Sequence, residues 1–169
     1  MLTEKTKQLL KDFIAELPES YRDMFQEIAE YAISFGYTPK KTKSKDFALD
    51  FSKSKVMRTI MKMEVHDNAI KNNLPGLRLK FYANKEYSDI FKQGIQRVIE
   101  EFDARYTGCY GCGKCKGELE GYTYTYPDGK NVFRCGGELI AIHGFSPKDI
   151  PEIKVLIQGQ DEFFMKKRG

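Results

Sequence analysis

The residues of this sequence best suited to chemistry are its cysteines. All of them stand at Cys109, Cys112, Cys115 and Cys135, with the spacing C-x2-C-x2-C-x19-C. Two thiolates separated by two residues can close a tight turn around a metal ion, and Gly113 lets the backbone turn its amides toward the sulfurs. Four soft ligands with no spare cysteine favour a closed, structural site. The sequence therefore predicts a Zn²⁺ ion bound by these four thiolates.

A predicted hairpin explains the long step from Cys115 to Cys135. Alternating residues over 119–126 meet a Pro-Asp-Gly turn at 127–129, and the chain then returns through Val132 and Phe133. This path brings the last cysteine back to the first three. A zinc ion with four thiolates carries a net charge of about −2. We expect three neighbouring cations to offset it: Lys114, Lys116 and Arg134.

Other interpretations of the cysteines remain open. The segment CYGCGK resembles the knuckle of zinc ribbons and rubredoxin-like sites, but compressed cysteine runs also hold [4Fe-4S] clusters in ferredoxins. There a fourth cysteine and a proline usually follow after three residues, whereas Leu119 stands here. Unliganded thiols or disulfides are disfavoured by the short loops and by a cytoplasmic location. Three ligands within seven residues are crowded, so His143 could replace Cys109 or Cys115, although a lone histidine is more often not a ligand.

A basic sheet face is the second candidate site. Residues 37–85 contain 12 basic and four acidic side chains, a balance of +8, whereas the whole chain carries +4. Alternation places five residues on the outer face of a predicted sheet: Arg58, Lys62, Arg78, Lys80 and Tyr82. Such cations with an aromatic ring could bind phosphates and stack a base, so the expected partner is nucleic acid or an acidic protein surface. An ordinary solvated sheet face explains the same pattern and is the commoner case.

Catalytic machinery is not evident in the sequence. The only histidines are His66 and His143, and neither lies in a recognisable nucleophile pattern. The loop residues His66, Asp67 and Asn68 could line a pocket, but an ordinary polar loop is the simpler interpretation. We therefore expect a non-enzymatic binding module with a structural zinc site, and the alternative is an iron-sulfur or redox-sensing protein.

Periodicity predicts the elements that position these residues. Apolar residues at helical spacing predict four helices, over 3–16, over 20–35 with Ser20 as N-cap, over 88–104, and from 146 onward. Alternation predicts strands over 46–51, 56–65 and 77–82, the first two joined by residues 52–54, and a short further strand over 139–142.

These elements predict an α+β fold. Residues 1–105 form an antiparallel three-stranded sheet covered by helices, and residues 106–169 form a four-cysteine metal-binding β-hairpin and a C-terminal helix, packed on the first part as one unit. The 169 residues, 41% hydrophobic and 31% charged, suit an ordinary soluble protein. Neither an apolar run of about 18 residues nor a secretory signal is visible, so we expect a cytoplasmic location without membrane contact.

A family resemblance accompanies this layout. The segment LPESYRDMFQEIAEYAISFGYTPKKTKSKDFALDF, with two more strands and the helix from Tyr87, is similar to small uncharacterised bacterial domains of the YdhG-like and transporter-associated kind. The resemblance covers about residues 17–104 and implies a bacterial α+β domain, without a catalytic motif. The tail looks like an appended zinc hairpin, which departs from a standard zinc ribbon because Cys135 stands alone instead of in a second C-x2-C pair.

Overall fold

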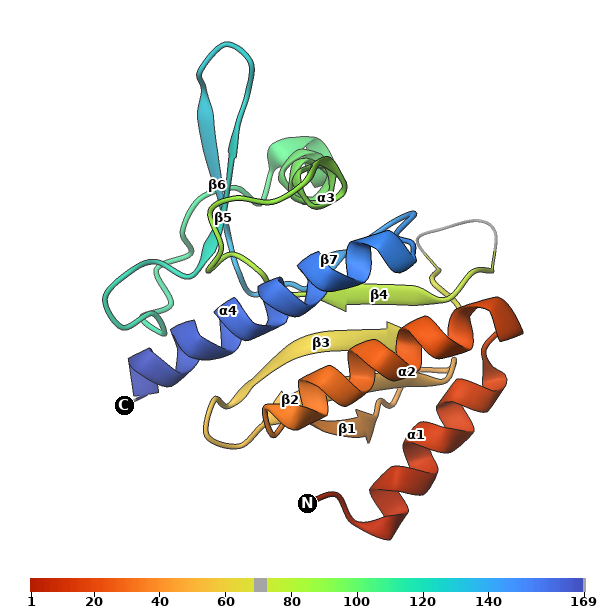
Figure 1. Cartoon of the computed structure of the whole chain (residues 1–169). Coiled ribbons are helices and arrows are strands. Elements are labelled where there is room, and N and C mark those ends of the chain that lie inside the picture. Colours follow the sequence, from red (N-terminus) through yellow and green to blue (C-terminus); the bar gives the residue numbers. More distant parts are fainter. Residues whose placement is uncertain (69–72, 169) are drawn as a thin grey trace.

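Figure 1 shows the computed structural model of the chain, which describes residues 1–68 and 73–168. In chain order its elements are α1 (Glu4–Glu16), α2 (Glu19–Ser34), β1 (Thr38–Lys41), β2 (Ala48–Lys53), β3 (Arg58–Glu64), β4 (Gly76–Leu79), α3 (Asp89–Glu100), the short turn η1 (Glu101–Ala104), β5 (Gly121–Thr125), β6 (Asn131–Cys135), β7 (Ile140–Ala141), the short turn η2 (Pro147–Asp149) and α4 (Ile150–Arg168). The predicted α+β class is confirmed.

The main sheet is antiparallel and has the strand order β1-β2-β3-β4-β7. The main sheet therefore has more strands than the three that were predicted. Strand β1 was not predicted because its lysines and Pro39 interrupt the alternation of apolar and polar residues. Lysines and proline are typical of an edge strand. The short strand expected over 139–142 is confirmed as β7, which pairs with β4 through Leu79 and Ile140.

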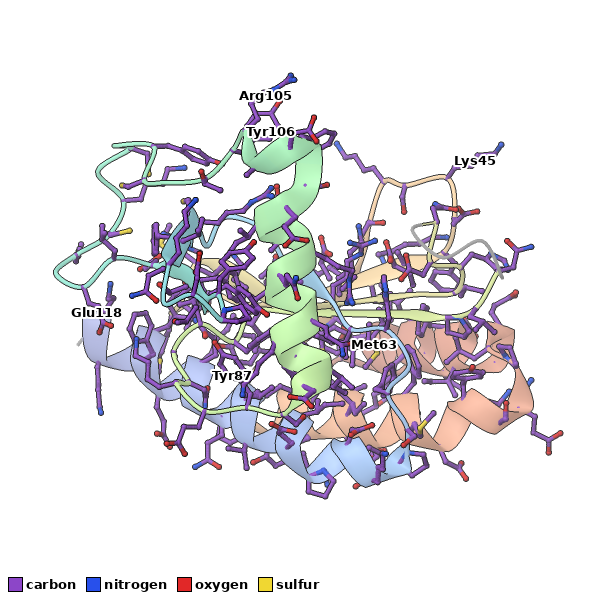
Figure 2. All side chains as sticks on the ribbon, turned by 90° about the horizontal axis from the view of Figure 1, so that it is seen from above. Lys45, Met63, Tyr87, Arg105, Tyr106 and Glu118 are labelled. Atoms are coloured by element: carbon purple, nitrogen blue, oxygen red, sulfur yellow. The ribbon has the colours of Figure 1, made fainter. Side chains whose placement is uncertain are left out.

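The two faces of this sheet have different surroundings. Helices α1, α2 and α4 lie together on one face, and α3 lies crosswise at the β7 edge, as the two views show (Figures 1 and 2). Gly94 of α3 lies so close to β7 that a Cβ there would stand 2.7 Å from Ile140 Cγ2. The opposite face, here called the outer face, carries the predicted basic residues.

A β-bulge changes which residues of the β2–β3 hairpin are buried. Phe51 pairs with Met61 and Ser52 with Thr59, so Ile60 is the extra residue, and it is buried together with Met61. Strand β2 continues through Lys53 instead of ending before Ser52. The connection consequently falls on residues 54–57.

Helix boundaries depart from the prediction in two places. Helix α2 begins at Glu19, so Ser20 lies inside its first turn and is not the N-cap. Helix α3 ends at Glu100 because three consecutive residues, Phe102, Asp103 and Ala104, have φ values of 53°, 57° and 58°. L-residues rarely adopt this left-handed conformation, and it ends the helix.

The C-terminal segment packs on the first 105 residues. Strand β7 completes the main sheet, and Tyr82 packs edge-on against Phe163 and Phe164 of α4. Both segments contribute side chains to one hydrophobic core. No helix in the described part of the chain is both long enough and apolar enough to cross a membrane.

Candidate metal centre and outer-face groove

The cysteines lie at one end of the β5–β6 hairpin. The hairpin strands follow the prediction, with Gly121 opposite Cys135 at the end where the two strands open. Residues 105–120, here called the cysteine loop, precede β5 and carry the other three cysteines. Cys109 and Cys112 are exposed, Cys115 and Cys135 are half-buried, and all four are free thiols.

Both ends of the cysteine loop are hydrogen-bonded to chain next to Cys135. At one end, Gly108 donates its backbone N–H to the carbonyl oxygen of Phe133 over 2.7 Å. At the other end, Gly136 donates its N–H to the carbonyl oxygen of Glu120 over 2.8 Å. The start and the end of the cysteine loop are therefore both held next to the last residues of β6.

Backbone amides already contact two of the sulfurs. Gly111 N–H donates to Cys109 Sγ at 3.4 Å, and Glu120 N–H donates to Cys115 Sγ at 3.3 Å. Gly111 has φ of +65°, a conformation that glycine adopts without the strain other residues incur. Such amide contacts stabilise negative charge on sulfur.

A closed ligand set is not formed. Across residues 1–68 and 73–168, no three side chains of His, Cys, Asp or Glu are grouped so that they could hold a metal ion. The structure thus contains the expected hairpin but not an assembled four-cysteine centre. The donor chemistry fits zinc, whereas assembly would require the cysteines to be brought together, and two of them, Cys109 and Cys112, are exposed.

Lys80 is the buried cation of this region. It is only 8% exposed, and its Nζ donates to the carbonyl oxygens of Gly136 and Gly137 at 3.0 and 3.2 Å. Burial, followed by repulsion from Arg58, lowers its pKa to about 8, while Glu120 and Cys135 oppose that shift. Lys80 therefore anchors the segment after Cys135 and is not the open surface cation that alternation predicted.

The other predicted counter-cations have different positions. Arg134 is 3% exposed and binds Glu101 and Glu138 beside α3, so its charge is already balanced there. Lys114 and Lys116 line a small cavity with Arg58, Glu120 and Lys167. Two of the three expected cations thus lie near Glu120, which closes the cysteine loop.

Tyr82 corrects the prediction of a base-stacking ring. It is 5% exposed and packs against Tyr122, Phe163 and Phe164 in edge-on geometry. Burial raises the pKa of its hydroxyl. Strand β4 ends at Leu79, so the alternation used to assign residues 80–82 to the outer face no longer applied.

The outer face holds a polar cavity of about 780 Å³. The four basic residues of the prediction line it, and so do four carboxylates: Asp50, Glu64, Glu101 and Glu138. Lys62 Nζ lies 3.6 Å from Glu64, and Arg58 lies 3.8 Å from Glu120. The face is therefore charge-balanced and not a continuous positive surface.

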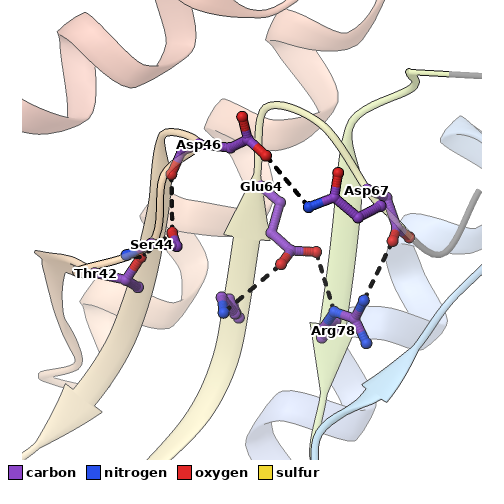
Figure 3. Close-up of polar contacts among 8 residues, drawn as sticks. Thr42, Ser44, Asp46, Glu64, Asp67 and Arg78 are labelled. Atoms are coloured by element: carbon purple, nitrogen blue, oxygen red, sulfur yellow. Dashed lines mark hydrogen bonds and ion pairs between the residues drawn. The ribbon is translucent and has the colours of Figure 1, made fainter.

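Arg78 is the best-fixed cation of this face. Its Nε lies 3.0 Å from Glu64 Oε2 and its Nη2 lies 3.2 Å from Asp67 Oδ1 (Figure 3). The loop carrying Asp67 is thereby tied to β4. Asp67 is buried, whereas His66 is exposed, so one of the loop residues considered in the sequence does turn inward.

A second cavity, of about 440 Å³, continues from the first between α3 and β7. The two share Arg78, Glu101, Glu138 and Leu139. Arg97 and His143 line only the second one, and no cysteine lines either. The two adjoining cavities are here together called the groove. His143 Nε2 lies 3.9 Å from Asp67 Oδ2, which places this histidine beside Asp67.

Sequence reasoning missed this groove because its residues come from distant segments. Arg78, Arg97 and His143 are far apart in the chain and share no motif. Comparisons with protein-family models, with curated proteins and with solved structures find no match to this chain.

Proposed function

We propose that this chain is a zinc-binding protein in which the thiolates of Cys109, Cys112, Cys115 and Cys135 hold one structural Zn²⁺. The observation that carries the proposal is the pair of backbone hydrogen bonds that tie Gly108 and Glu120 to the end of β6. Because the loop is fixed at both ends beside Cys135, its closure on a metal ion requires motion of the loop interior alone. Thiolate sites commonly assemble only when the metal binds.

The zinc ion would cross-link the cysteine loop to β6 and would take part in no reaction. The surrounding residues of the chain would stabilise the charge of the thiolates. Amides of Gly111 and Glu120 donate to two sulfurs, and the buried ammonium of Lys80 lies where it compensates negative charge at Cys135. Zinc binding and ordering of the cysteine loop are then one coupled event.

The second part of the proposal is a non-enzymatic binding role for the outer face. Its cavities have the size of small-molecule sites, and its cations are paired with carboxylates. This favours a small anionic ligand over a nucleic acid, because a polyanion would meet the paired carboxylates as well as the cations.

Elemental analysis of protein purified without added metal tests the metal site. We expect one zinc per chain in the natural sequence. Cys112→Ser should lose the ion and melt at a lower temperature, because a structural zinc contributes directly to folding. Tyr110→Ser changes an exposed loop residue that is not a thiol, so this variant should keep its zinc.

Two results would overturn this assignment. Metal-free protein whose melting temperature is the same with and without added zinc would remove the structural role. Iron with inorganic sulfide and an absorbance band near roughly 400 nm would instead assign the four cysteines to a [4Fe-4S] cluster.

A further inference from the structure

We infer that the cavity between α3 and β7 is an oxyanion-binding site, in which Arg97 and His143, together with Arg78, bind the carboxylate or phosphate group of a small molecule. The site shares no residue with the proposed zinc centre; the inference rests on the binding role proposed for the outer face and names the ligand class of that face.

The cavity is built by close contact of α3 with β7. At Gly94 the helix lies against Ile140 and Ala141, and a Cβ there would clash with Ile140. Val98 of α3 and Leu139, next to β7, also line this cavity. The volume of about 440 Å³ suits a small molecule.

Arg97 is held at this cavity with donors to spare. Its Nη2 donates to the carbonyl oxygen of Ala141 at 3.0 Å, which fixes the guanidinium against β7. Within the part of the chain that the structure describes, Arg97 has no carboxylate within ion-pair distance, unlike Arg78. A guanidinium carries five N–H donors, so several remain for a planar or tetrahedral anion.

His143 is the second anion-binding group. Its side chain is 30% exposed, and its buried Nε2 makes no hydrogen bond within residues 1–68 and 73–168 but lies 3.9 Å from Asp67 Oδ2. Burial lowers its pKa, Arg97 and Arg78 lower it further, and Asp67 opposes them. Arg97 and Arg78 thus outnumber Asp67 around this imidazole, and a bound anion would offset their repulsion of its protonated form.

The carboxylates that line the same cavity are engaged elsewhere. Glu101 and Glu138 both bind Arg134, at 3.1 and 2.5 Å. Glu100 accepts a hydrogen bond from the Tyr126 hydroxyl at 2.9 Å. The charge of Glu101 and Glu138 is therefore partly compensated by Arg134. Asp67 is buried on the side of Arg78 and His143, 3.2 Å from Arg78 Nη2 and 3.9 Å from His143 Nε2, so Arg97 is the cation left to meet an incoming anion first.

NMR titration of the imidazole signals tests the inference directly, because the chain has only two histidines and His66 is an exposed internal control. The full chain is titrated from pH 8 to pH 5 in sodium chloride, sodium sulfate or sodium acetate at equal ionic strength. Sulfate is the probe for phosphate groups, and acetate is the probe for carboxylates. His143→Gln assigns the two signals.

We expect sulfate or acetate to raise the pKa of His143 by about one unit relative to chloride, as an opposite charge nearby does. By linkage, the anion then binds about tenfold more tightly to the protonated imidazole. His66, exposed and outside the cavity, is the internal reference. Arg97→Gln should abolish the shift, whereas Arg105→Gln, at an exposed arginine outside the cavity, should leave it intact.

Each outcome decides a part of the inference. A shift with sulfate alone assigns a phosphate group, a shift with acetate alone assigns a carboxylate, and a shift with both assigns a general oxyanion site. Equal His143 pKa values in all three salts would overturn the inference. So would an undiminished shift in Arg97→Gln whose folding is shown intact by its melting curve.

Discussion

Gly136 donates its backbone N–H to the carbonyl oxygen of Glu120 over 2.8 Å, and this bond joins the two segments that carry Cys115 and Cys135. The N–H of Glu120 in turn donates to Cys115 Sγ at 3.3 Å. One residue, Glu120, therefore contacts the sulfur of one cysteine and the chain next to the other. Any metal site built from these thiols depends on this junction.

Substitution of Gly136 should loosen the junction. A Cβ at Gly136 would stand 2.5 Å from Tyr82 Cε1 and 3.0 Å from the Glu120 carbonyl oxygen, so Gly136→Ala must displace one of them. We expect a loss of roughly 1–3 kcal/mol in the free energy of unfolding, as for other overpacked sites. Zinc affinity should fall by about tenfold or more, which is typical when support for ligands is removed. Urea denaturation and competition with a chromophoric chelator measure the two effects.

The neighbouring glycine provides the matched control. A Cβ at Gly137 would meet no atom within 4 Å, so Gly137→Ala should keep both stability and zinc affinity near those of the natural sequence. If Gly136→Ala behaved like Gly137→Ala in both measurements, the junction would not support the thiolate site.

Arg134 should matter for stability and not for compensation of the thiolates. Its guanidinium, 3% exposed, binds Glu101, Glu138 and the carbonyl oxygen of Val98, and so fastens β6 to α3. Arg134→Met should lower the free energy of unfolding by roughly 1–3 kcal/mol, because the Val98 carbonyl loses a buried donor. Zinc stoichiometry should not change. Arg105→Met, at an exposed site, serves as the control, and equal urea midpoints for the two variants would refute the anchoring role.

His143 should contribute a pH dependence of stability with a definite sign. Its pKa in the folded chain lies below the unfolded value of about 6.5, because burial and the neighbouring arginines disfavour the charged ring. The unfolded state then binds more protons, so stability rises with pH in this range. The contribution is present above pH 6.5 and is lost as the pH falls through the lowered folded pKa.

Removal of the imidazole should flatten that profile. Between pH 7.5 and 5.5 the free energy of unfolding of His143→Gln should decline less steeply than that of the natural sequence in urea titrations. His66→Gln should retain the steeper decline, because His66 is exposed. A steeper decline in His143→Gln than in the natural sequence would reverse the predicted sign.

Local patterns predicted the elements well, and contacts between distant segments explain the rest. The helical stripe over 3–16 and the β5–β6 hairpin are encoded in consecutive residues, and both are confirmed. Strand β1 was not predicted because its own residues do not alternate; it is held in the sheet by pairing with β2. Tyr82 was placed on the wrong face because β4 ends three residues earlier. The groove beside β7 needs Arg97 and His143 to meet, which only the folded chain brings about.

Nucleic acid should bind the outer face weakly, and removal of one carboxylate should reveal why. Glu64 lies 3.6 Å from Lys62 and 3.0 Å from Arg78, so it neutralises two of the cations that phosphates would need. On a single strand each phosphate contact adds about 0.7 to the magnitude of the slope of log affinity against log salt, and we expect a magnitude below about 2 for the natural sequence. Glu64→Gln should strengthen binding of a fluorescent single-stranded RNA and steepen that slope, because it releases Lys62 and leaves Arg78 paired with Asp67 alone. Glu86→Gln, which removes an exposed carboxylate outside the groove, should do neither. The natural sequence could instead bind the RNA tightly and with a steep salt dependence, and Lys62→Gln could abolish that binding. This result would show that the carboxylates do not prevent nucleic acid from binding to this face.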